Sequence, residues 1–409
     1  MKVIFLSHFY PRSRRDYYFS RSKTGLSAAA DAHQYALALG LNKVCDDFDI
    51  VNLPAVSHYP IRYKDVRQHR EEICENGLQI INVGYNNIIE YQHISRSISA
   101  KRELERIIKE TKGPVYILEY GINYAIVKAA VDLKLKYPEK VKLCMIVPDL
   151  PQDVNTHGKL ITKILNFIHG LYFKTTEESF KYFDTFVLLT DQMKEVIGCG
   201  SNYIVSEGIY EEEVTKRIPH KEPDDSFVIF YGGMMYEKFG IMNLVNAFHS
   251  LKDPKFKLQL CGYGDCVNMV KELAKIDSRI EYLGIVSRDE ALNYQSKASL
   301  LVNPRIPKGN SFTKYSFPSK TLEYLASGTP SLIYQLEGIP QEYFEYCYYL
   351  DAKHTDVTSL ADKILEISDI PVSERLNMAS KARAFVIENK NSISQAKKIV
   401  QLLNDTVSI

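Results

Sequence analysis

The sequence predicts an α/β protein with two domains, each built around a doubly wound parallel sheet. Short apolar runs typical of buried strands alternate with stretches of helical periodicity in both halves of the chain. Strands that alternate with helices are the pattern of a parallel sheet covered on both faces. The length of 409 residues is too great for one ordinary hydrophobic core and suits two domains.

Composition and charge favour a soluble globular protein and exclude several classes. Apolar residues make up 45% of the chain and charged residues 25%, which is usual for such proteins. The net charge of +1 gives no strong electrostatic field for binding nucleic acid. The sequence contains no run of about eighteen apolar residues, which a membrane-spanning helix would need. The seven cysteines form no CxxC pair, so we expect free thiols in a reducing, cytoplasmic compartment.

The N-terminal half carries the first set of elements. Strands are expected over Lys2–Ser7, Phe48–Leu53, Leu78–Val83, Val115–Glu119, Val141–Val147 and Thr185–Thr190, and helices over Ala28–Leu39, Ile98–Glu110 and Tyr124–Leu135. The basic segment Pro11–Gly25 follows the first strand. Because ligands of such sheets bind outside the carboxyl ends of strands, this segment is expected to line a cleft, where Gly25 lets the backbone approach a ligand. A surface loop with solvated arginines is an equal alternative.

The stretch Lys159–Lys174 is amphipathic and basic. Its large apolar residues share one helical face and its lysines lie around that face. A helix of this kind can lie in a membrane interface, although such a stripe more often belongs to a core. We therefore expect either a peripheral contact with the inner face of a membrane or a core helix.

The segment Asn303–Pro330 is the most informative stretch of the C-terminal half. It follows the apolar strand Ala298–Val302 and opens into a polar loop. Pro318 is placed where a helix begins and Gly328 where it ends. The amino end of such a helix, at the mouth of a sheet, suits a phosphate. Glu323 lies on the flank of this helix, where a carboxylate can accept hydrogen bonds from two ribose hydroxyls; a solvated glutamate on a plain helix is the alternative.

Further strands and helices complete the C-terminal half. Glycine turns are expected to end two of the strands, at Gly232-Gly233 and at Gly262-Tyr263-Gly264. The charged, proline-containing run Tyr210–Ser226 is the expected linker. Strands are expected over Ser226–Tyr231, Lys257–Cys261, Ile280–Leu283 and Ser331–Tyr334, and helices over Glu290–Ser296, Thr358–Ser368, Glu374–Glu388 and Ser392–Leu403.

Residues 315–334, YSFPSKTLEYLASGTPSLIY, resemble the nucleotide-sugar signature of glycosyltransferases with the GT-B fold. The resemblance is to family 4 of the retaining enzymes, the glycosyl transferases group 1, and the PDLP segment at 148–151 resembles a bacterial polysaccharide-type subgroup. It covers the C-terminal half well and the N-terminal half loosely. It implies two Rossmann-like doubly wound domains that face each other across a cleft. Residues 1–205 would form the acceptor side, with a final helix at about 388–409 packing back on them, and residues 206–387 the donor side.

The resemblance also implies roles for single residues. Glu323 would hold the donor ribose, and Lys238 matches the phosphate-binding lysine, with Gly232 and Gly233 giving close backbone approach. The donor would further contact Gly262, Tyr263, Tyr315, Ser316, Phe317, Pro318, Ser319 and Lys320. On the acceptor side, Asp149 is fixed between two prolines, where it can meet an acceptor hydroxyl or simply form a turn.

Two positions depart from the family pattern. Tyr315 stands where the family usually has a first glutamate, and Gly233 stands where it often has an arginine. Arg305, just beyond a strand end, can bind phosphate bidentately and stand in for that arginine. A surface ion pair of Arg305 is the alternative.

The implied reaction moves a sugar, with retention, from a UDP- or GDP-sugar to a glycan or lipid-linked glycan in bacterial surface polysaccharide synthesis. The expected catalytic residues are Lys238, Glu323, Asp149 and Arg305. The sequence has no HExxH motif, no paired Cys/His ligands and no DxD motif at a strand end. No metal or other cofactor is therefore expected, and cations with a helix amino end would stabilise the leaving nucleotide electrostatically.

Three other functions stay open. A GT-B isomerase acting on a nucleotide sugar would give product without an acceptor. A catalytically weak nucleotide-sugar-binding subunit would fit the departures at Tyr315 and Gly233. A dinucleotide oxidoreductase needs a GxGxxG motif, and the Gly262-Tyr263-Gly264 turn lacks the third glycine.

Overall fold

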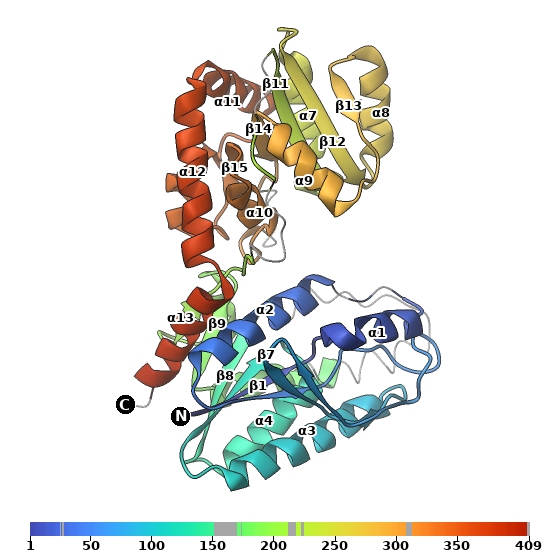
Figure 1. The fold of residues 1–409 in the computed structure, drawn as a ribbon, viewed down its shortest axis with the longest axis vertical. Helices are drawn as coiled ribbons and strands as arrows, with labels where there is room; N and C mark the ends of the chain where they lie inside the picture. The colour runs from blue at the N-terminus through green and yellow to red at the C-terminus, as the bar shows by residue number, and fades with distance from the viewer. Residues whose placement is uncertain are drawn as a thin grey trace. The chain divides into compact units, whose positions relative to one another are not determined.

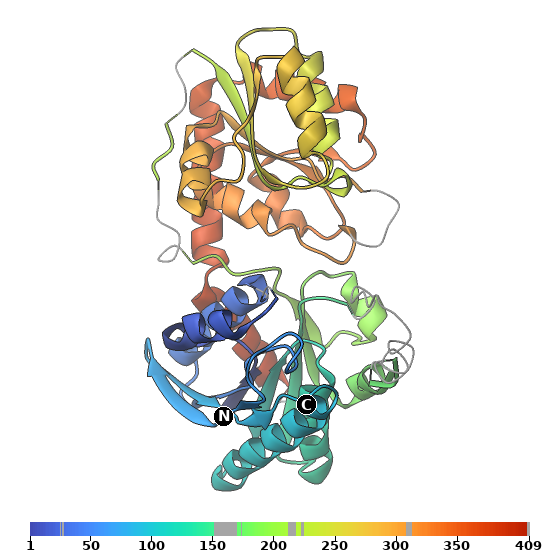
Figure 2. The same ribbon diagram turned by 90° about the vertical axis from the view of Figure 1, so that its right-hand side faces the viewer.

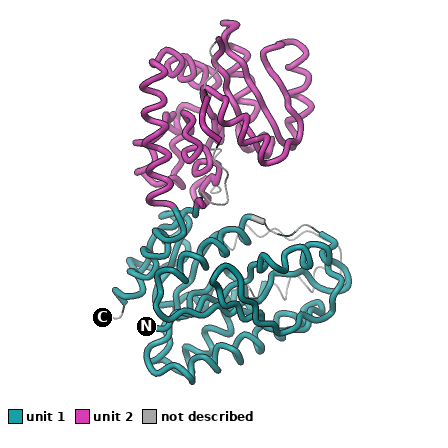
Figure 3. Tube along the Cα trace, in the orientation of Figure 1, with its two compact units in different colours: residues 1–209, 391–409 teal, residues 210–390 magenta. Residues whose placement is uncertain are grey.

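The computed structural model describes residues 1–24, 26, 28–150, 170–172, 174–211, 218–221, 225–307 and 313–406. The chain divides into two compact units (Figure 3). Unit 1 comprises Met1–Ile209 and Asn391–Ile409, and unit 2 comprises Tyr210–Lys390. The domain limits expected from the sequence, at residues 205 and 387, lie close to these.

Unit 1 is built on a sheet with the strand order β10-β9-β8-β7-β1-β2-β5-β4. Its strands are β1 (Lys2–Ser7), β2 (Phe48–Asn52), β4 (Glu71–Glu75), β5 (Leu78–Asn82), β7 (Val115–Tyr120), β8 (Val141–Val147), β9 (Thr185–Leu188) and β10 (Tyr203–Val205), with a separate ribbon of β3 (Arg67–Gln68) and β6 (Tyr85–Asn86). The order changes direction at β1, which pairs in parallel with β2 on one side and β7 on the other. Ligands of such sheets bind outside the carboxyl ends of the strands at this point.

One edge of the unit 1 sheet differs from the predicted parallel arrangement. β4 pairs with β5 in antiparallel fashion. Asn76 and Gly77 join the two strands, and both have positive φ, 48° and 79°. This backbone suits a two-residue hairpin turn, for which Asn-Gly is a favoured sequence. The Asn-Gly pair is therefore the sequence signal for the hairpin.

Helices cover both faces of the unit 1 sheet (Figure 1). They are α2 (Ala28–Val44), α3 (Tyr91–Glu110), α4 (Tyr124–Lys136), α6 (Met193–Ile197) and α13 (Ser392–Asp405), together with α1 described below. α2 and α13 pack together on one face, and α3 and α4 pack together on the other.

The final helix, α13, is an integral part of unit 1. Gly40 of α2 permits its close approach, because a Cβ on Gly40 would lie 2.1 Å from the carbonyl oxygen of Ser392. Ile399 and Leu403 of α13 are buried in the core between this helix pair and the sheet. The C-terminal segment therefore packs on the unit that holds the N-terminus.

The segment after β1 contains helix over residues 12–21, so the prediction of a loop over Pro11–Gly25 is wrong for those residues. It forms a short 3-10 helix, η1 (Arg12–Arg14), and then α1 (Arg15–Arg21). Glu75, far along the chain, accepts a hydrogen bond from the backbone N–H of Arg12 at 2.7 Å, which satisfies a donor at the helix start. Arg12 also pairs with the buried Asp31 at 2.7 Å. This arginine is held by the protein and is not simply solvated.

Unit 2 has a fully parallel sheet with the strand order β13-β12-β11-β14-β15-β16. Its strands are β11 (Phe227–Met234), β12 (Phe256–Tyr263), β13 (Ile280–Tyr282), β14 (Leu300–Asn303), β15 (Ser331–Gln335) and β16 (Tyr348–Asp351). The order changes direction between β11 and β14, which pair with each other. This is the second point in the molecule where such a sheet binds ligands.

The helices of unit 2 lie on both sides of its sheet, with α9 on one face and α7 on the other (Figures 1 and 2). They are α7 (Ile241–Ser250), α8 (Val267–Ile276), α9 (Arg288–Lys297), α10 (Lys320–Ser327), α11 (Val357–Asp369) and α12 (Val372–Asn389). Both units are thus doubly wound α/β sheets with parallel cores, and the predicted fold class is confirmed.

Two strands of unit 2 run through the glycines that were expected to end them. Gly232 and Gly233 belong to β11 and pair in register with Cys261 and Gly262 of β12. A Cβ on Gly262 would lie 1.7 Å from the carbonyl oxygen of Gly233. The glycines therefore bring the two backbones together without interrupting the pairing, because no side chains keep them apart.

Helix α10 is fixed at both ends and on its inner face. It begins at Lys320, so Pro318 precedes the helix and does not occupy its first position as predicted. Gly328 ends the helix with a φ of 76°, as predicted. The hydroxyl of the buried Tyr324 accepts a hydrogen bond from the N–H of Gly232 at 3.3 Å, which ties the helix to the end of β11.

Candidate functional site

The predicted phosphate-binding residues lie where the strand order of the unit 2 sheet changes direction. Gly233 is near the carboxyl end of β11, and Arg305 follows the carboxyl end of β14. Lys238 lies in the short 3-10 helix η4 (Glu237–Phe239), just beyond β11. Together with Lys320 and Glu323 of α10, these residues are called the unit 2 site below.

The structure brings the turn that carries Lys238 against the loop that carries Arg305. Gly240, which ends this turn, has a φ of 78°, and a Cβ there would lie 1.9 Å from the carbonyl oxygen of Pro304. The Lys238 Nζ lies 5.2 Å from the ring centroid of Phe239, and the Arg305 Cζ lies 5.9 Å from the same centroid. Glycine is therefore required at position 240 for the two cations to share one aromatic ring.

Arg305 is a buried side chain, with 7% of its surface exposed. One of its guanidinium N–H groups donates to Ser316 Oγ at 2.5 Å. Burial lowers the pKa of Arg305 to about 10, so the guanidinium is charged at neutral pH although it is poorly solvated. A neighbouring anion would offset this loss of solvation, so the surroundings of Arg305 suit a phosphate.

The side chain of Lys320 lies over Gly233. A Cβ built on Gly233 would lie 2.2 Å from Lys320 Cε and 2.5 Å from Nζ. The backbone φ of Gly233 is 149°, which residues with a side chain rarely adopt. The absence of a side chain at position 233 therefore lets Lys320 reach the end of β11.

Glu323 is oriented by Gln295, a residue of α9 that was not predicted. Gln295 Nε2 donates to Glu323 Oε1 at 2.7 Å, and Arg288 Nη2 lies 4.0 Å from Glu323 Oε2. Gln295 itself is buried, and its backbone carbonyl accepts a hydrogen bond from Thr329 Oγ1 at 3.0 Å. The carboxylate of Glu323 is thus held in place and remains partly exposed, as a group that binds ligand hydroxyls must be.

The other predicted donor contacts of unit 2 differ in exposure. Tyr263 is 54% exposed at the end of β12, and Ser319 is exposed at the start of α10. Tyr315 is partly buried. Phe317 is buried and its ring centroid lies 5.3 Å from that of Tyr343, so this residue packs in the core of the unit.

Of the residues predicted in unit 1, only Asp149 is described. It is exposed and lies just beyond the carboxyl end of β8. Burial raises the pKa of Tyr120, and the charge of Asp149 raises it further. The two groups therefore lie near each other at the carboxyl ends of β7 and β8. Gly25 and most of the amphipathic stretch Lys159–Lys174 lie outside the described residues.

Three titratable groups near the carboxyl ends of the unit 1 strands have no role predicted from the sequence. His8 follows β1 and His33 belongs to α2, and each ring centroid lies 5.6 Å from that of Tyr120. Burial lowers the pKa of His8 to about 3 and that of His33 to about 4. Glu119 of β7 is fully buried, neither carboxyl oxygen has a hydrogen-bond partner in the described part of the chain, and burial raises its pKa well above the usual value. Burial therefore disfavours the charged form of all three groups. The positions of His8 and Glu119 at strand ends were the available sequence signal.

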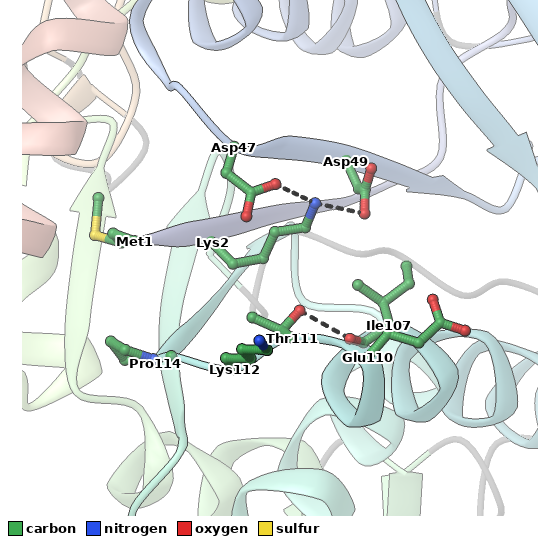
Figure 4. A pocket seen from close by; sticks show the side chains of 10 residues that line it. Met1, Lys2, Asp47, Asp49, Ile107, Glu110, Thr111, Lys112 and Pro114 are labelled. Carbon is green, nitrogen blue, oxygen red and sulfur yellow. Dashed lines mark hydrogen bonds and ion pairs between the residues drawn. The ribbon is translucent and has the colours of Figure 1, made fainter.

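A cavity of about 530 Å³ opens at the amino ends of the unit 1 strands (Figure 4). Lys2 lines it and pairs with Asp47 at 2.6 Å and with Asp49 at 2.8 Å. The lysine charge is met by these two carboxylates. Because open α/β sheets bind their ligands at the opposite, carboxyl ends of the strands, this cavity is not the candidate site.

Three further features concern the described ranges. Within them, no cluster of three His, Cys, Asp or Glu side chains is placed to hold a metal ion. No helix in that part of the chain is long and apolar enough to cross a membrane. The seven cysteines are free thiols, as predicted.

Comparison with known proteins identifies the class of unit 2. Residues 226–369 match the family model described as glycosyl transferases group 1. This range contains Gly233, Lys238, Arg305, Lys320 and Glu323, so the whole unit 2 site falls within it. No curated protein sequence matches the chain.

Solved structures with the same fold cover nearly the whole chain. A sucrose-phosphate synthase from Thermosynechococcus elongatus is 13% identical, with a TM-score of 0.60 and coverage of 100% of both chains. A glycosyltransferase from Rickettsia africae is 14% identical, with a TM-score of 0.59, and 99% of this chain and 98% of that chain are covered. Anabaena HepE in complex with UDP is 11% identical, with a TM-score of 0.58, and 99% and 100% are covered.

The fold and the family match together define the protein as a glycosyltransferase of the GT-B type. At these identities the solved structures establish the fold, and the match over residues 226–369 carries the enzyme class. Residues 226–369 of unit 2 are accordingly similar to the group 1 glycosyl transferases.

Proposed function

We propose that the protein is a retaining glycosyltransferase of family 4 that transfers a sugar from a UDP- or GDP-sugar to a glycan or a lipid-linked glycan. Bacterial surface polysaccharide synthesis at the inner face of the cytoplasmic membrane is the proposed setting. The observation that carries the proposal is the unit 2 site, where Lys238 and Arg305 lie against Phe239 at the change of strand order. Relatives in fold, such as Anabaena HepE bound to UDP, support a nucleotide donor.

Glu323 is the proposed ribose-binding residue of the donor site. Gln295 donates to one of its oxygens at 2.7 Å, which orients the carboxylate and uses only part of its capacity to accept hydrogen bonds. The remaining lone pairs can accept bonds from the two ribose hydroxyls. Charge-assisted bonds of this kind are about twice as strong as bonds between neutral groups.

Lys238 and Arg305 are the proposed diphosphate-binding cations. In the reaction the bond between the anomeric carbon and the donor phosphate oxygen breaks, and a bond to the acceptor oxygen forms on the same face. We propose that the acceptor proton passes to the departing phosphate oxygen, so no protein nucleophile is needed. The charge that grows on the leaving diphosphate is met by the two cations, without a metal ion or other cofactor.

The acceptor side is assigned to unit 1. Asp149 is exposed beyond the end of β8, where it can accept a hydrogen bond from an acceptor hydroxyl. Peripheral attachment to an anionic bilayer through Lys159–Lys174 is proposed from the sequence alone. Liposome flotation at low and high salt tests this attachment, because electrostatic binding to lipid weakens as salt rises. If the protein does not float with the liposomes at low salt, the apolar face of Lys159–Lys174 belongs to the protein core.

A panel of nucleotide sugars and free nucleotides, screened by thermal unfolding with and without Mg²⁺, tests the donor assignment. A true donor at about a hundred times its dissociation constant should add about 2.7 kcal/mol of stability. The same donor should then be consumed with formation of a glycosidic product. If no UDP- or GDP-compound shifts the unfolding temperature, the proposed donor class is wrong.

A nucleotide-sugar-binding subunit without turnover is the second candidate function, because Tyr315 and Gly233 replace two charged residues of the family pattern. It would bind the nucleotide as tightly as the enzyme and yield no product. An isomerase, in contrast, would convert the nucleotide sugar with no acceptor present. Product detection with and without an acceptor mixture separates the three.

A further inference from the structure

Lys320 carries a charge for which the described residues provide no partner. Its side chain is partly buried at the first position of α10, and among the described residues no oxygen forms a hydrogen bond or ion pair with its ammonium. Burial lowers its pKa, and the charge of Glu323, three residues along the helix, opposes this only in part. An unpaired ammonium in such a place is unfavourable unless an anion joins it.

The path of the Lys320 side chain depends on the glycine at position 233. Cε and Nζ of Lys320 lie 2.2 and 2.5 Å from the position that a Cβ on Gly233 would take. A side chain at position 233 and the extended Lys320 therefore exclude each other. In the family pattern an arginine side chain starts at this position. Here the end of the Lys320 side chain, which comes from α10, occupies that space.

Arg305, the residue expected to replace that arginine, is held elsewhere. It is buried, and it donates to Ser316 Oγ in the loop that leads to α10. Its guanidinium lies 5.9 Å from the ring centroid of Phe239, whereas the Lys320 ammonium lies 5.7 Å from that of Tyr231, the β11 residue next to Gly232. The Arg305 guanidinium is thus bound to Ser316, whereas the end of the Lys320 side chain lies over Gly233.

We propose that Lys320 contacts the donor diphosphate in the place of the arginine missing at position 233, so that Gly233 and Lys320 form one functional pair. This inference rests on the proposed function, since it assumes a nucleoside diphosphate in the unit 2 site. The amino end of α10 adds a partial positive charge beside the ammonium. Lysine acts here as a point charge at the end of a flexible chain, as a third cation in addition to Lys238 and Arg305.

Lys320→Met, which keeps the length of the side chain and removes its charge, is the first test. Binding of UDP, GDP, uridine and guanosine to the full chain is measured by isothermal titration calorimetry. Affinity for the diphosphate that binds the wild-type protein should fall by about ten- to a hundredfold, while affinity for its nucleoside should change little. Lys275→Met, which removes an exposed lysine paired with Glu272 on α8, is the matched control and should bind like the wild type.

The unfolding temperature without ligand separates binding from structure. A lysine that only supports the fold would lower this temperature when replaced, whereas removal of an unpaired, partly buried cation should leave it unchanged or raise it. A Lys320→Met protein that binds the diphosphate as tightly as the wild type would overturn the inference. If the wild-type protein binds neither UDP nor GDP, the proposed function itself is wrong. Equal binding of a diphosphate by both proteins would contradict only the role of Lys320.

A double-mutant cycle tests the coupling of the two positions. Gly233→Ala adds a Cβ that displaces the end of Lys320, so it should weaken diphosphate binding by about tenfold or more in the wild-type protein. In the Lys320→Ala background the obstructing side chain is gone and only the strain of a φ of 149° at position 233 remains, so Gly233→Ala should weaken binding by less than it does in the wild-type protein. If the fold losses of affinity in the two single variants multiply to give the loss in the double variant, the residues act independently and the proposed pair is refuted.

Discussion

The two units have the same kind of sheet, yet the groups at the carboxyl ends of their strands differ in charge. In unit 2, Lys238, Arg305 and Lys320 collect where the strand order changes direction. In unit 1, the strand ends carry His8 and Glu119, whose charged forms burial disfavours, and the exposed carboxylate of Asp149. A cluster of cations suits a diphosphate, whereas these groups suit a ligand that offers hydroxyls. The comparison teaches that the fold fixes where a ligand binds, and the residue types decide which ligand it is.

Replacing Lys238 should have the largest effect on the cationic side of this comparison. Lys238→Ala removes a charge that is proposed to face the leaving diphosphate, whose negative charge would grow in the transition state. Turnover should therefore fall by about a hundred- to a thousandfold, with a smaller change in donor affinity. Steady-state kinetics with varied donor check this split. A change confined to the donor KM would assign Lys238 to ground-state binding alone.

Neutralising Glu323 should have the next largest effect. Glu323→Gln keeps the shape of the side chain and weakens its bonds to the ribose hydroxyls. A hydrogen bond to a charged group contributes about 1.5–3 kcal/mol, so donor affinity should fall by about ten- to a hundredfold. The corresponding 2′-deoxynucleotide, which lacks one of these hydroxyls, should lose less affinity in the variant than in the wild type. Equal losses in both proteins would place the ribose away from Glu323.

In unit 1, the raised pKa of the buried Glu119 predicts that the free energy of unfolding depends on pH. Between the ordinary pKa of a glutamate and the raised pKa of the buried carboxyl, the native state keeps a proton that the unfolded state has lost. The free energy of unfolding should therefore decrease by about 1.4 kcal/mol per pH unit in this range. Glu119→Gln removes this dependence, so the variant should be more stable than the wild type at pH 8 and gain less at pH 4.

Glu105→Gln provides a control of opposite sign for this experiment. The hydrogen bond from Lys136, and then those from Tyr137 and Lys109, lower the pKa of Glu105 to about 2. Its stabilising effect is present above the ordinary pKa and lost as the pH falls toward 2. The variant should thus be no more stable than the wild type at neutral pH. Chemical denaturation at several pH values checks both substitutions, and equal profiles for them would contradict the buried neutral Glu119.

Removal of metal ions should have the smallest effect. The unit 2 site offers cations where many enzymes place a divalent ion, so transfer should proceed in EDTA at the rate found in its absence. Assays with EDTA, and with EDTA followed by excess Mg²⁺ or Mn²⁺, measure this. A large loss in EDTA that either ion restores would show that the cations alone do not meet the charge of the leaving diphosphate.

Much of the fold and part of the site could be predicted from the sequence. The alternation of strands and helices is written in local apolar periodicity, so most elements were expected within a few residues of their limits. Glu323 and Lys238 were predicted as candidate site residues through a motif and a strand end. Gln295 was not, because nothing in the sequence of α9 indicates that its amide bonds to Glu323. The alternative of a surface ion pair for Arg305 does not fit its burial.

What the sequence by itself determined is local: the elements, the left-handed glycine that ends α10, and the kinds of charge at the strand ends. Tertiary structure decided which distant residues meet. Glu75 holds the helical segment after β1, and Lys320 fills the space left by Gly233. The physical reason is that periodicity and turn chemistry act between neighbours in the chain. Contacts between elements arise only when strand order and backbone approach bring their side chains together.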